Sequence, residues 1–268
     1  MSTVANRFRT GKEKIYSPLM LLFGAILWPI FTLGILAGLS SPIPQVATMS
    51  WVYFSYGVGI ALFVWLSGGF YRATAFGNMV LLGPSQFPEL HAMVVAGAKD
   101  LGMGEAPRAF LYNSNGLFNA FARRLLGGRF VFLTSALVEA SSDDQVRFVI
   151  GHELGHHAAG HCNPWMNLLK LPAHAVPFLA PAYSRQREFT CDAIGGHLAN
   201  DLPVSRSALM MLGCGCGRLN GKMNLDAFMA QETMMPPTFG FINEKFRSHP
   251  RLTRRMAALK ARGVDFGA

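Results

Sequence analysis

Residues 143–157 read DDQVRFVIGHELGHH and contain the pattern His-Glu-x-x-His, on which the interpretation of the whole chain depends. Either Ser141 or Ser142 can cap a helix that begins here, and the two aspartates that follow suit the positive end of the helix dipole. Apolar residues then recur at helical spacing and predict one buried face: Val146, Val149, Ile150 and Leu154. The sequence therefore predicts a helix that carries the pattern.

On this helix His152 and His156 lie four residues apart on one face, so that both imidazoles can reach the same metal ion. Glu153 projects beside the metal, where the general base for a zinc-bound water must stand. Gly151 and Gly155 each cost about 1 kcal/mol of helix propensity relative to alanine, but they leave room for a neighbouring backbone or a metal site. The alternative is a solvated polar face of an amphipathic helix, which the rest of the chain makes less favourable.

The composition indicates a membrane protein. Of the 268 residues 51% are apolar and 15% are charged, whereas a typical soluble domain has roughly 25% charged residues. The net charge of +9 could suggest nucleic acid, but the chain has no nucleic-acid motif and no basic run interleaved with aromatic residues. Anionic lipid headgroups explain the basic excess more simply, so we expect a bilayer and no nucleic acid as partner.

The four cysteines do not form a Cys-x-x-Cys pair. Cys214 and Cys216 are too close in sequence for an easy mutual disulfide. We therefore expect all four, Cys162, Cys191, Cys214 and Cys216, to be buried, reduced thiols of a cytosolic domain rather than metal ligands.

Two long uncharged runs follow a basic N-terminus, residues 1–15. Residues 16–39 form a run of 24 residues without a charge, and residues 51–71 form a second run of 21. Each can span a bilayer, and the first is too long for the apolar region of a typical signal peptide. We expect a transmembrane hairpin over residues 16–71, with a neutral loop at residues 40–50.

The charges around the hairpin predict its orientation. The basic N-terminus and Arg72 lie on one side and the neutral loop lies on the other. The positive-inside rule then places the N-terminus and everything after Arg72 in the cytoplasm, for a membrane of the bacterial inner-membrane type. We expect a multi-pass membrane protein with a cytoplasmic catalytic domain.

Residues 84–262 have the pattern of a globular domain that is mostly α-helical with a small β-sheet. A helix is predicted at residues 87–101, and strands are predicted at residues 108–112, 119–123 and 130–133. If the strand with Asn119 and Ala120 is an edge strand along the cleft, it would bind an extended peptide by adding it to the sheet. The alternative for Asn119 is a turn residue.

Residues 164–183 are apolar and long enough to span, but they contain Lys170, His174 and four prolines. If the third metal ligand lies beyond them, one crossing would put that ligand on the opposite side of the membrane from His152. We therefore expect a non-spanning insert, which dips into the membrane and returns, lies in the interface or packs as a lid over the cleft.

A catalytic zinc site needs a third protein ligand. The scheme His-Glu-x-x-His-x-x-Gly-x-x-His fails, because Ala159 and Cys162 occupy its glycine and third histidine positions. His161 is expected to point well away from the pair's face and, like His157, to be structural or solvated.

Glu188 and Asp192 are the better candidates, because they lie four residues apart and share a face if residues 184–192 are helical. Glu188 can then bind the metal while Asp192 accepts a hydrogen bond from a ligating histidine and fixes its tautomer. Spacing alone equally allows a surface helix in which both acids pair with Arg185 and Arg187.

Four ordered pieces resemble the membrane-anchored zinc metallopeptidases that include the HtpX heat-shock protease and the type I CAAX prenyl protease. The pieces cover about residues 85–262: Asn119-Ala120-Phe121-Ala122, Gly151-His152-Glu153-Leu154-Gly155-His156, Arg185-x-x-Glu188-Phe189-x-x-Asp192, and Ser248-His249-Pro250 with Arg255. The resemblance implies an α+β metallopeptidase domain of the gluzincin type with one zinc ion. HtpX-like members carry two further membrane helices before the third ligand, and the 31 residues between His156 and Glu188 are too few for them.

The resemblance also implies the role of each site residue. The implied zinc ligands are His152, His156 and Glu188, and Glu153 is the implied base. His249 is expected to stabilise the oxyanion, and Arg255 to support that end of the cleft.

The expected function is zinc-dependent hydrolysis of peptide bonds in a polypeptide substrate at the membrane, with membrane-protein quality control as the role that the family suggests. The alternative is a catalytically silent, zinc-binding membrane scaffold or sensor. A structural zinc would need a fourth protein ligand, and the sequence offers no obvious one. The oligomeric state is not predicted.

Overall fold

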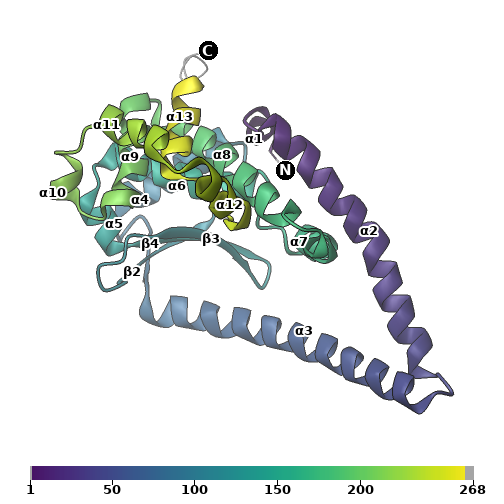
Figure 1. Ribbon diagram of the computed structural model, residues 1–268. Coiled ribbons are helices and arrows are strands. Elements are labelled where there is room, and N and C mark those ends of the chain that lie inside the picture. The colour runs from purple at the N-terminus through teal and green to yellow at the C-terminus, as the bar shows by residue number, and fades with distance from the viewer. Residues whose placement is uncertain (1, 263–268) are drawn as a thin grey trace.

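The computed structural model describes residues 2–262 and shows two long helices that extend from a compact domain and meet at their far ends (Figure 1). These helices are α2 (Gly11–Leu39) and α3 (Pro44–Asn78), and a short helix, α1 (Thr3–Arg7), precedes them. Both long helices are sufficiently long and apolar to cross a membrane. The expected order, two apolar helices followed by a mostly helical domain with a small sheet, is confirmed.

The predicted loop at residues 40–50 is wrong for most of its length, because α3 already begins at Pro44. A proline in the first helical turn loses no hydrogen bond, and its fixed φ favours the helix, so Pro44 starts the helix rather than excluding it. The helix also continues past Arg72 to Asn78. Both helices are thus longer than the spans predicted from the uncharged runs.

The sheet has the strand order β1-β2-β4-β3, and β3 forms one edge. β2 (Arg108–Tyr112) and β4 (Gly128–Thr134) are parallel, whereas β1 (Val80–Leu81) and β3 (Ala120–Leu125) pair antiparallel with β2 and β4, respectively. The three predicted strands are therefore present, with β3 starting at Ala120. β1 is too short for its sequence pattern to be distinguished from a loop.

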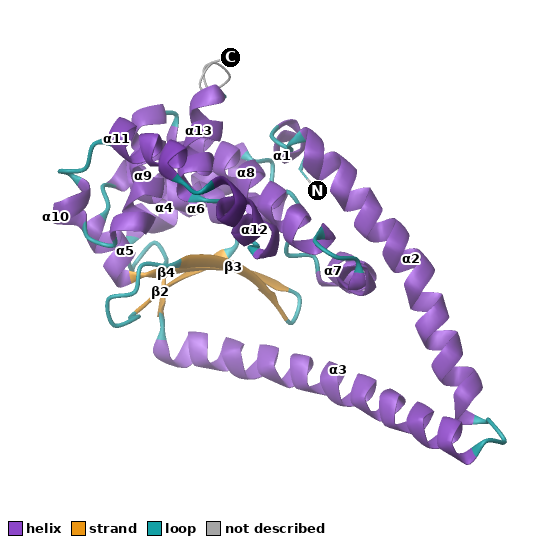
Figure 2. Cartoon of the chain, in the orientation of Figure 1, coloured by secondary structure: helices purple, strands orange, loops and turns teal. Residues whose placement is uncertain are grey.

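Helices cover one face of the sheet, and the end of α3 lies against the other (Figure 2). Side chains alternate along β4: Phe130 and Phe132 face a cluster that includes Ala75 of α3, whereas Val131 and Leu133 face the main helical core. The main helices of this layer are α4 (Pro88–Asp100), α6 (Asp143–Ala158), α8 (Leu179–Ala199), α9 (Leu202–Cys214) and α13 (Leu252–Ala261). The shorter elements are α5 (Ser135–Ala140), α7 (Pro164–Lys170), η1 (Leu171–Ala175), α10 (Gly217–Asn220), α11 (Leu225–Ala230), η2 (Gln231–Met234) and α12 (Pro237–Phe246).

The α6 and α8 helices approach each other closely at glycines. A Cβ atom on Gly151 would lie 2.9 Å from Gly195 Cα, and a Cβ atom on Gly195 would lie 2.7 Å from the carbonyl oxygen of Phe148. The expectation that Gly151 makes room for a neighbouring backbone is confirmed. This contact brings the side chains of α8 to those of α6.

Gly195→Ala should therefore lower the melting temperature of the protein, because the added methyl group must push two helix backbones apart. Overpacking of this kind costs about 1–3 kcal/mol. Gly77→Ala is the matched control, since Gly77 is also helical but would have no atom within 4 Å of an added Cβ. Thermal unfolding that is equal for both variants would contradict the importance of the contact.

The apolar insert at residues 164–183 consists of α7, η1 and the beginning of α8, and it packs against α2. The indole N–H of Trp28 donates to the carbonyl oxygen of Leu168 at 2.8 Å, and Lys170 Nζ lies 2.8 Å from Ser17 Oγ. The seven residues of α7 are too few to cross a bilayer. None of the insert residues 164–183, all of which the structure describes, lines the cavity that His152 and His156 border.

Candidate active site

The helix that carries His-Glu-x-x-His begins where the sequence predicts. Ser142 is the N-cap of α6: its Oγ accepts from the Gln145 N–H at 3.3 Å, and Gln145 Oε1 accepts from the Ser142 N–H at 2.9 Å. This reciprocal capping box fixes the first turn of the helix. His152 and His156 then lie on one face, with ring centroids 5.1 Å apart.

Glu188 of α8 faces both of these histidines. Its Oε2 lies 3.5 Å from His152 Nε2, and its Oε1 lies 3.6 Å from His156 Nε2. Burial would raise the pKa of Glu188, but its hydrogen bond to His152 and the nearby charges hold it well below its usual range. Two imidazole nitrogens and one charged carboxylate therefore point at the same small region.

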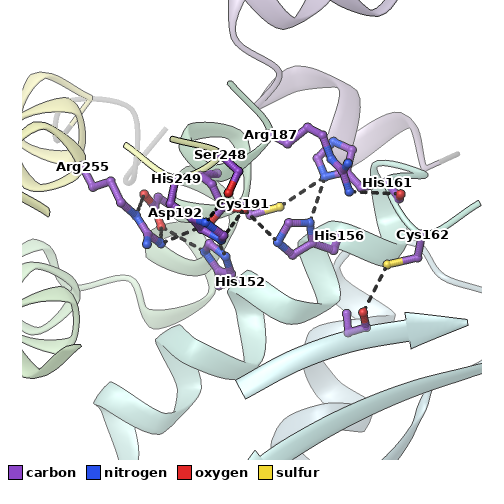
Figure 3. Close-up of polar contacts among 12 residues, drawn as sticks. His152, His156, His161, Cys162, Arg187, Cys191, Asp192, Ser248, His249 and Arg255 are labelled. Atoms are coloured by element: carbon purple, nitrogen blue, oxygen red, sulfur yellow. Dashed lines mark hydrogen bonds and ion pairs between the residues drawn. The ribbon is translucent and has the colours of Figure 1, made fainter. Parts of the chain in front are cut away.

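Asp192 holds the other side of the His152 ring. His152 Nδ1 lies 3.0 Å from Asp192 Oδ1, and a carboxylate only accepts, so Nδ1 carries a proton and Nε2 is the nitrogen that faces Glu188. Arg255 binds the same carboxylate through Nε at 2.8 Å and Nη2 at 2.6 Å, as Figure 3 shows. The predicted proximity of Asp192 to a histidine of the pattern is thus present.

The alternative pairing of both acids with Arg185 and Arg187 is wrong. Arg185 donates to the backbone carbonyl oxygens of Glu244 and Arg247, each at 2.7 Å, and Arg187 donates to the carbonyl oxygen of His161. These arginines bond carbonyl oxygens at the end of α12 and in the turn after α6, because the contact between α6 and α8 turns the acidic face of α8 inward.

His161 does not point away from the site as expected. Its Nδ1 lies 3.2 Å from His156 Nδ1, and its Nε2 lies 3.0 Å from Glu13 Oε1. The expectation assumed a continuing helix, but α6 ends at Ala158, and Gly160, with a φ of +79°, reverses the chain. His157, in contrast, is buried against the sheet, with Nε2 2.9 Å from the carbonyl oxygen of Phe130.

Two further residues, Glu153 of α6 and His249 of the loop before α13, line the cavity beside the histidines. Burial raises the pKa of Glu153 to about 7, partly offset by the charge of His152. His249 is exposed on the loop before α13, with Nε2 3.8 Å from Glu188 Oε1 and Nδ1 3.0 Å from Ser248 Oγ (Figure 3). Both residues lie where a bound substrate could contact them.

The cavity that these residues border has a volume of about 400 Å³, within the range of ligand-binding sites. Asn119 and the first residues of strand β3 form one wall, and helices α6 and α8 form the floor. The cavity is therefore an open cleft with the edge of the sheet along it.

The donor set of this cleft fits a metal ion. Burial alone would lower the pKa of His152, but hydrogen bonds to Asp192 and Glu188 raise it to about 10, so the site favours positive charge beside its carboxylates. Burial lowers the pKa of His156 well below its usual range and keeps this ring neutral. Among the described residues, His152, His156 and Cys191 also form a group whose donor atoms all lie within 4.8 Å of one another.

The model of Peptidase family M48 matches residues 84–176 and 163–263 of this chain. The chain belongs to Peptidase family M48. The resemblance stated from the sequence is thereby confirmed. The match covers the domain that contains all the predicted site residues.

Two curated relatives and one solved structure are similar to this chain. It is 29% identical to the plastoglobule-localized metallopeptidase 48 of Arabidopsis thaliana over 70% of this chain and 59% of the relative. It is 31% identical to a protease HtpX homolog of Pyrobaculum islandicum, over 58% of this chain and 42% of the relative. The chain thus spans about half the length of these relatives. The crystal structure of S. mikatae Ste24p shares 17% sequence identity with this chain at a TM-score of 0.49, and the match covers 93% of this chain and 66% of the Ste24p chain.

The sequence did not reveal two neighbours of the site, Glu13 and Cys191. In the sequence, Glu13 is the single acid of the basic N-terminus, residues 1–15, and Cys191 is one of the four thiols expected to be reduced. Cys191 lies one turn from Glu188 on a helix, so its spacing was a usable signal. Glu13 carries no local signal for the site, because His161 and Thr190, the two partners that connect it to the site, lie more than a hundred residues away.

Proposed function

We propose that this chain is a membrane-bound zinc endopeptidase with one zinc ion held by His152, His156 and Glu188. The convergence of two imidazole nitrogens and the Glu188 carboxylate on one region of the cleft carries the proposal. Zinc prefers such ligands, and three protein ligands leave one position open for catalysis. The match to a metallopeptidase family supports the same conclusion.

Glu188 is a better third ligand than Cys191 for a geometric reason. Cys191 Sγ lies 3.5 Å from His161 Nδ1, the atom that also faces His156 Nδ1, whereas Glu188 faces the Nε2 atoms of both histidines. Burial also raises the pKa of the Cys191 thiol well above its usual range. A zinc ion would have to displace the thiol proton, whereas the Glu188 carboxylate is already charged.

A zinc ion bound here would polarise the substrate carbonyl and lower the pKa of a water molecule. Glu153 then accepts the proton of the attacking water and delivers it to the leaving amine nitrogen. The His249 imidazole reaches the cleft from its exposed loop and donates to the oxyanion that forms on the carbonyl. Arg255 holds Asp192, which in turn holds the His152 ring.

The edge of the sheet supports an extended polypeptide as the substrate. β3 pairs only with β4 in the four-stranded sheet, and Ala120 is opposite Leu133. The backbone of the neighbouring residue Asn119 is bonded to Thr134 of β4: its C=O accepts from the Thr134 N–H, and its N–H donates to Thr134 Oγ1. Because the backbone groups of successive residues in a strand point to opposite sides, the N–H and C=O of Ala120 point away from β4 and toward the cleft. An added peptide strand would pair there, and the Asn119 side chain would contact it.

We place α2 and α3 in a bilayer as a hairpin, with the basic residues 1–15 and the peptidase domain, residues 84–262, on its cytoplasmic side. The helix lengths and hydropathy support the two spans. The positive-inside rule supports the orientation. Membrane-protein quality control is the role that this placement favours, because misassembled membrane proteins would meet the cleft near the bilayer surface.

The test is cleavage of an unfolded reporter protein by the detergent-purified, zinc-loaded full chain. We expect cleavage within the reporter chain that a chelator stops and that added zinc restores. Measurement of fragment masses distinguishes internal cleavage from removal of terminal residues. One bound zinc without any cleavage would contradict the proposal and favour the silent scaffold.

A further inference from the structure

The N-terminal segment is docked on the peptidase domain before it enters α2. The Ser2 N–H donates to the carbonyl oxygen of Ala158 at 3.1 Å, and the Thr10 N–H donates to Thr190 Oγ1 at 3.2 Å. Arg9 donates to the carbonyl oxygen of Ala159. These contacts attach the segment to the end of α6 and to the middle of α8, close to the predicted metal ligands.

Glu13, in the first turn of α2, has no exposed surface at all. Its Oε1 lies 3.0 Å from His161 Nε2 and 3.6 Å from Arg9 Nη1, and its Oε2 accepts from the hydroxyl of Thr190. A buried carboxylate costs several kcal/mol unless charges and hydrogen bonds compensate it. A fully buried glutamate at the start of an apolar helix does not contribute to solubility, so its buried contacts indicate another role.

The hydrogen bonds of Glu13 determine which ring nitrogen carries the proton in His161 and, through His161, in His156. An ionised carboxylate only accepts, so His161 Nε2 carries a proton, and Nδ1 of the neutral ring is an acceptor. His156 Nδ1, 3.2 Å away, then donates to it. The Cys191 thiol, 3.5 Å from the same His161 nitrogen, is a weak donor and agrees with this direction.

The consequence for His156 is that its proton stays on Nδ1 and its lone pair stays on Nε2. That nitrogen is the one that faces Glu188. Asp192 does the same for His152 by a direct hydrogen bond. The two histidines of the pattern thus each have a carboxylate that orients them: Asp192 binds His152 directly, and Glu13 acts through the His161 ring, whose contact with His156 Figure 3 shows.

We propose that Glu13 and His161 are positioning residues for His156, so that the metal site includes the first turn of the first apolar helix. The proposal rests on the proposed function, because it takes His156 as a ligand. Glu13 lies outside the region that matches the peptidase family, residues 84–263. Docking of the membrane anchor and the geometry of the metal site are thereby linked through two side chains.

The test compares the zinc affinity of the full chain in detergent for wild type, Glu13→Leu and His161→Phe, by competition with a chromogenic chelator. Loss of an orienting partner typically weakens metal binding by roughly 10–100-fold, and we expect a loss in this range. The double variant Glu13→Leu/His161→Phe should lose the same factor as each single variant, because either change already breaks the chain of hydrogen bonds. It replaces a buried polar pair by apolar groups, which preserves folding better than removal of one partner.

Ser2→Ala is the matched control, since the Ser2 hydroxyl lies in the same docked segment and bonds the carbonyl oxygen of Leu101 and the Ala5 N–H rather than Glu13 or His161. Its zinc affinity should equal that of wild type. The visible spectrum of the cobalt-substituted chain should shift in Glu13→Leu but not in Ser2→Ala, since only the former releases the His156 ring. Glu13→Gln keeps an acceptor for His161 and should recover part of the affinity.

Wild-type zinc affinity in the folded double variant would overturn the proposal, as would equal losses in Ser2→Ala and Glu13→Leu. Failure of the proposed function has a different signature. In that case wild type binds no zinc, or Glu188→Ala retains it.

Discussion

Glu153→Gln should reduce cleavage of an unfolded reporter by roughly 10²–10⁴-fold, the usual contribution of a general base. Glutamine has the same shape but cannot accept the proton of the attacking water. The carboxyl group borders the cleft without facing both histidines as Glu188 does, so zinc should stay bound. Initial cleavage rates and the zinc content of the purified variant measure the two effects separately.

Glu139→Gln is the matched control for this variant, because Glu139 carries the same group on the exposed surface of α5. Its cleavage rate should equal that of wild type. If Glu153→Gln cleaves at the wild-type rate, another residue is the base. If it loses zinc as well, Glu153 belongs to the ligand set.

The features that the sequence predicted well are those that local periodicity determines. The cap at Ser142, the apolar face of α6 and the alternating strand around Phe130 each depend on neighbours within a few residues. The spacing of His152 and His156 likewise needs only a helix. These expectations hold because no distant part of the chain has to be known.

The features that failed or stayed open depend on how distant elements meet. Spacing could not decide whether Glu188 faces a metal or an arginine, because the close approach of Gly151 and Gly195 determines which face of α8 turns inward. His161 was misplaced because the reversal at Gly160 follows the helix end. The role of Glu13 was missed because His161 lies 148 positions further along the chain.

The second large effect is expected for Glu188→Ala. This variant should weaken zinc binding by more than the roughly 10–100-fold that is typical for loss of a residue that only orients a ligand. The change removes the only one of the three proposed ligands that carries negative charge.

Cys191→Ser is the matched comparison for Glu188→Ala, because Cys191 is one turn further along α8 and beside His161, not between the two Nε2 atoms. It should keep full zinc occupancy. Zinc content after dialysis and affinity by chelator competition measure both variants. The reverse pattern, with zinc lost only in Cys191→Ser, would assign the third ligand to the thiol. Loss in both variants would indicate four protein ligands, a closed site without an open position, and hence the silent scaffold rather than the peptidase.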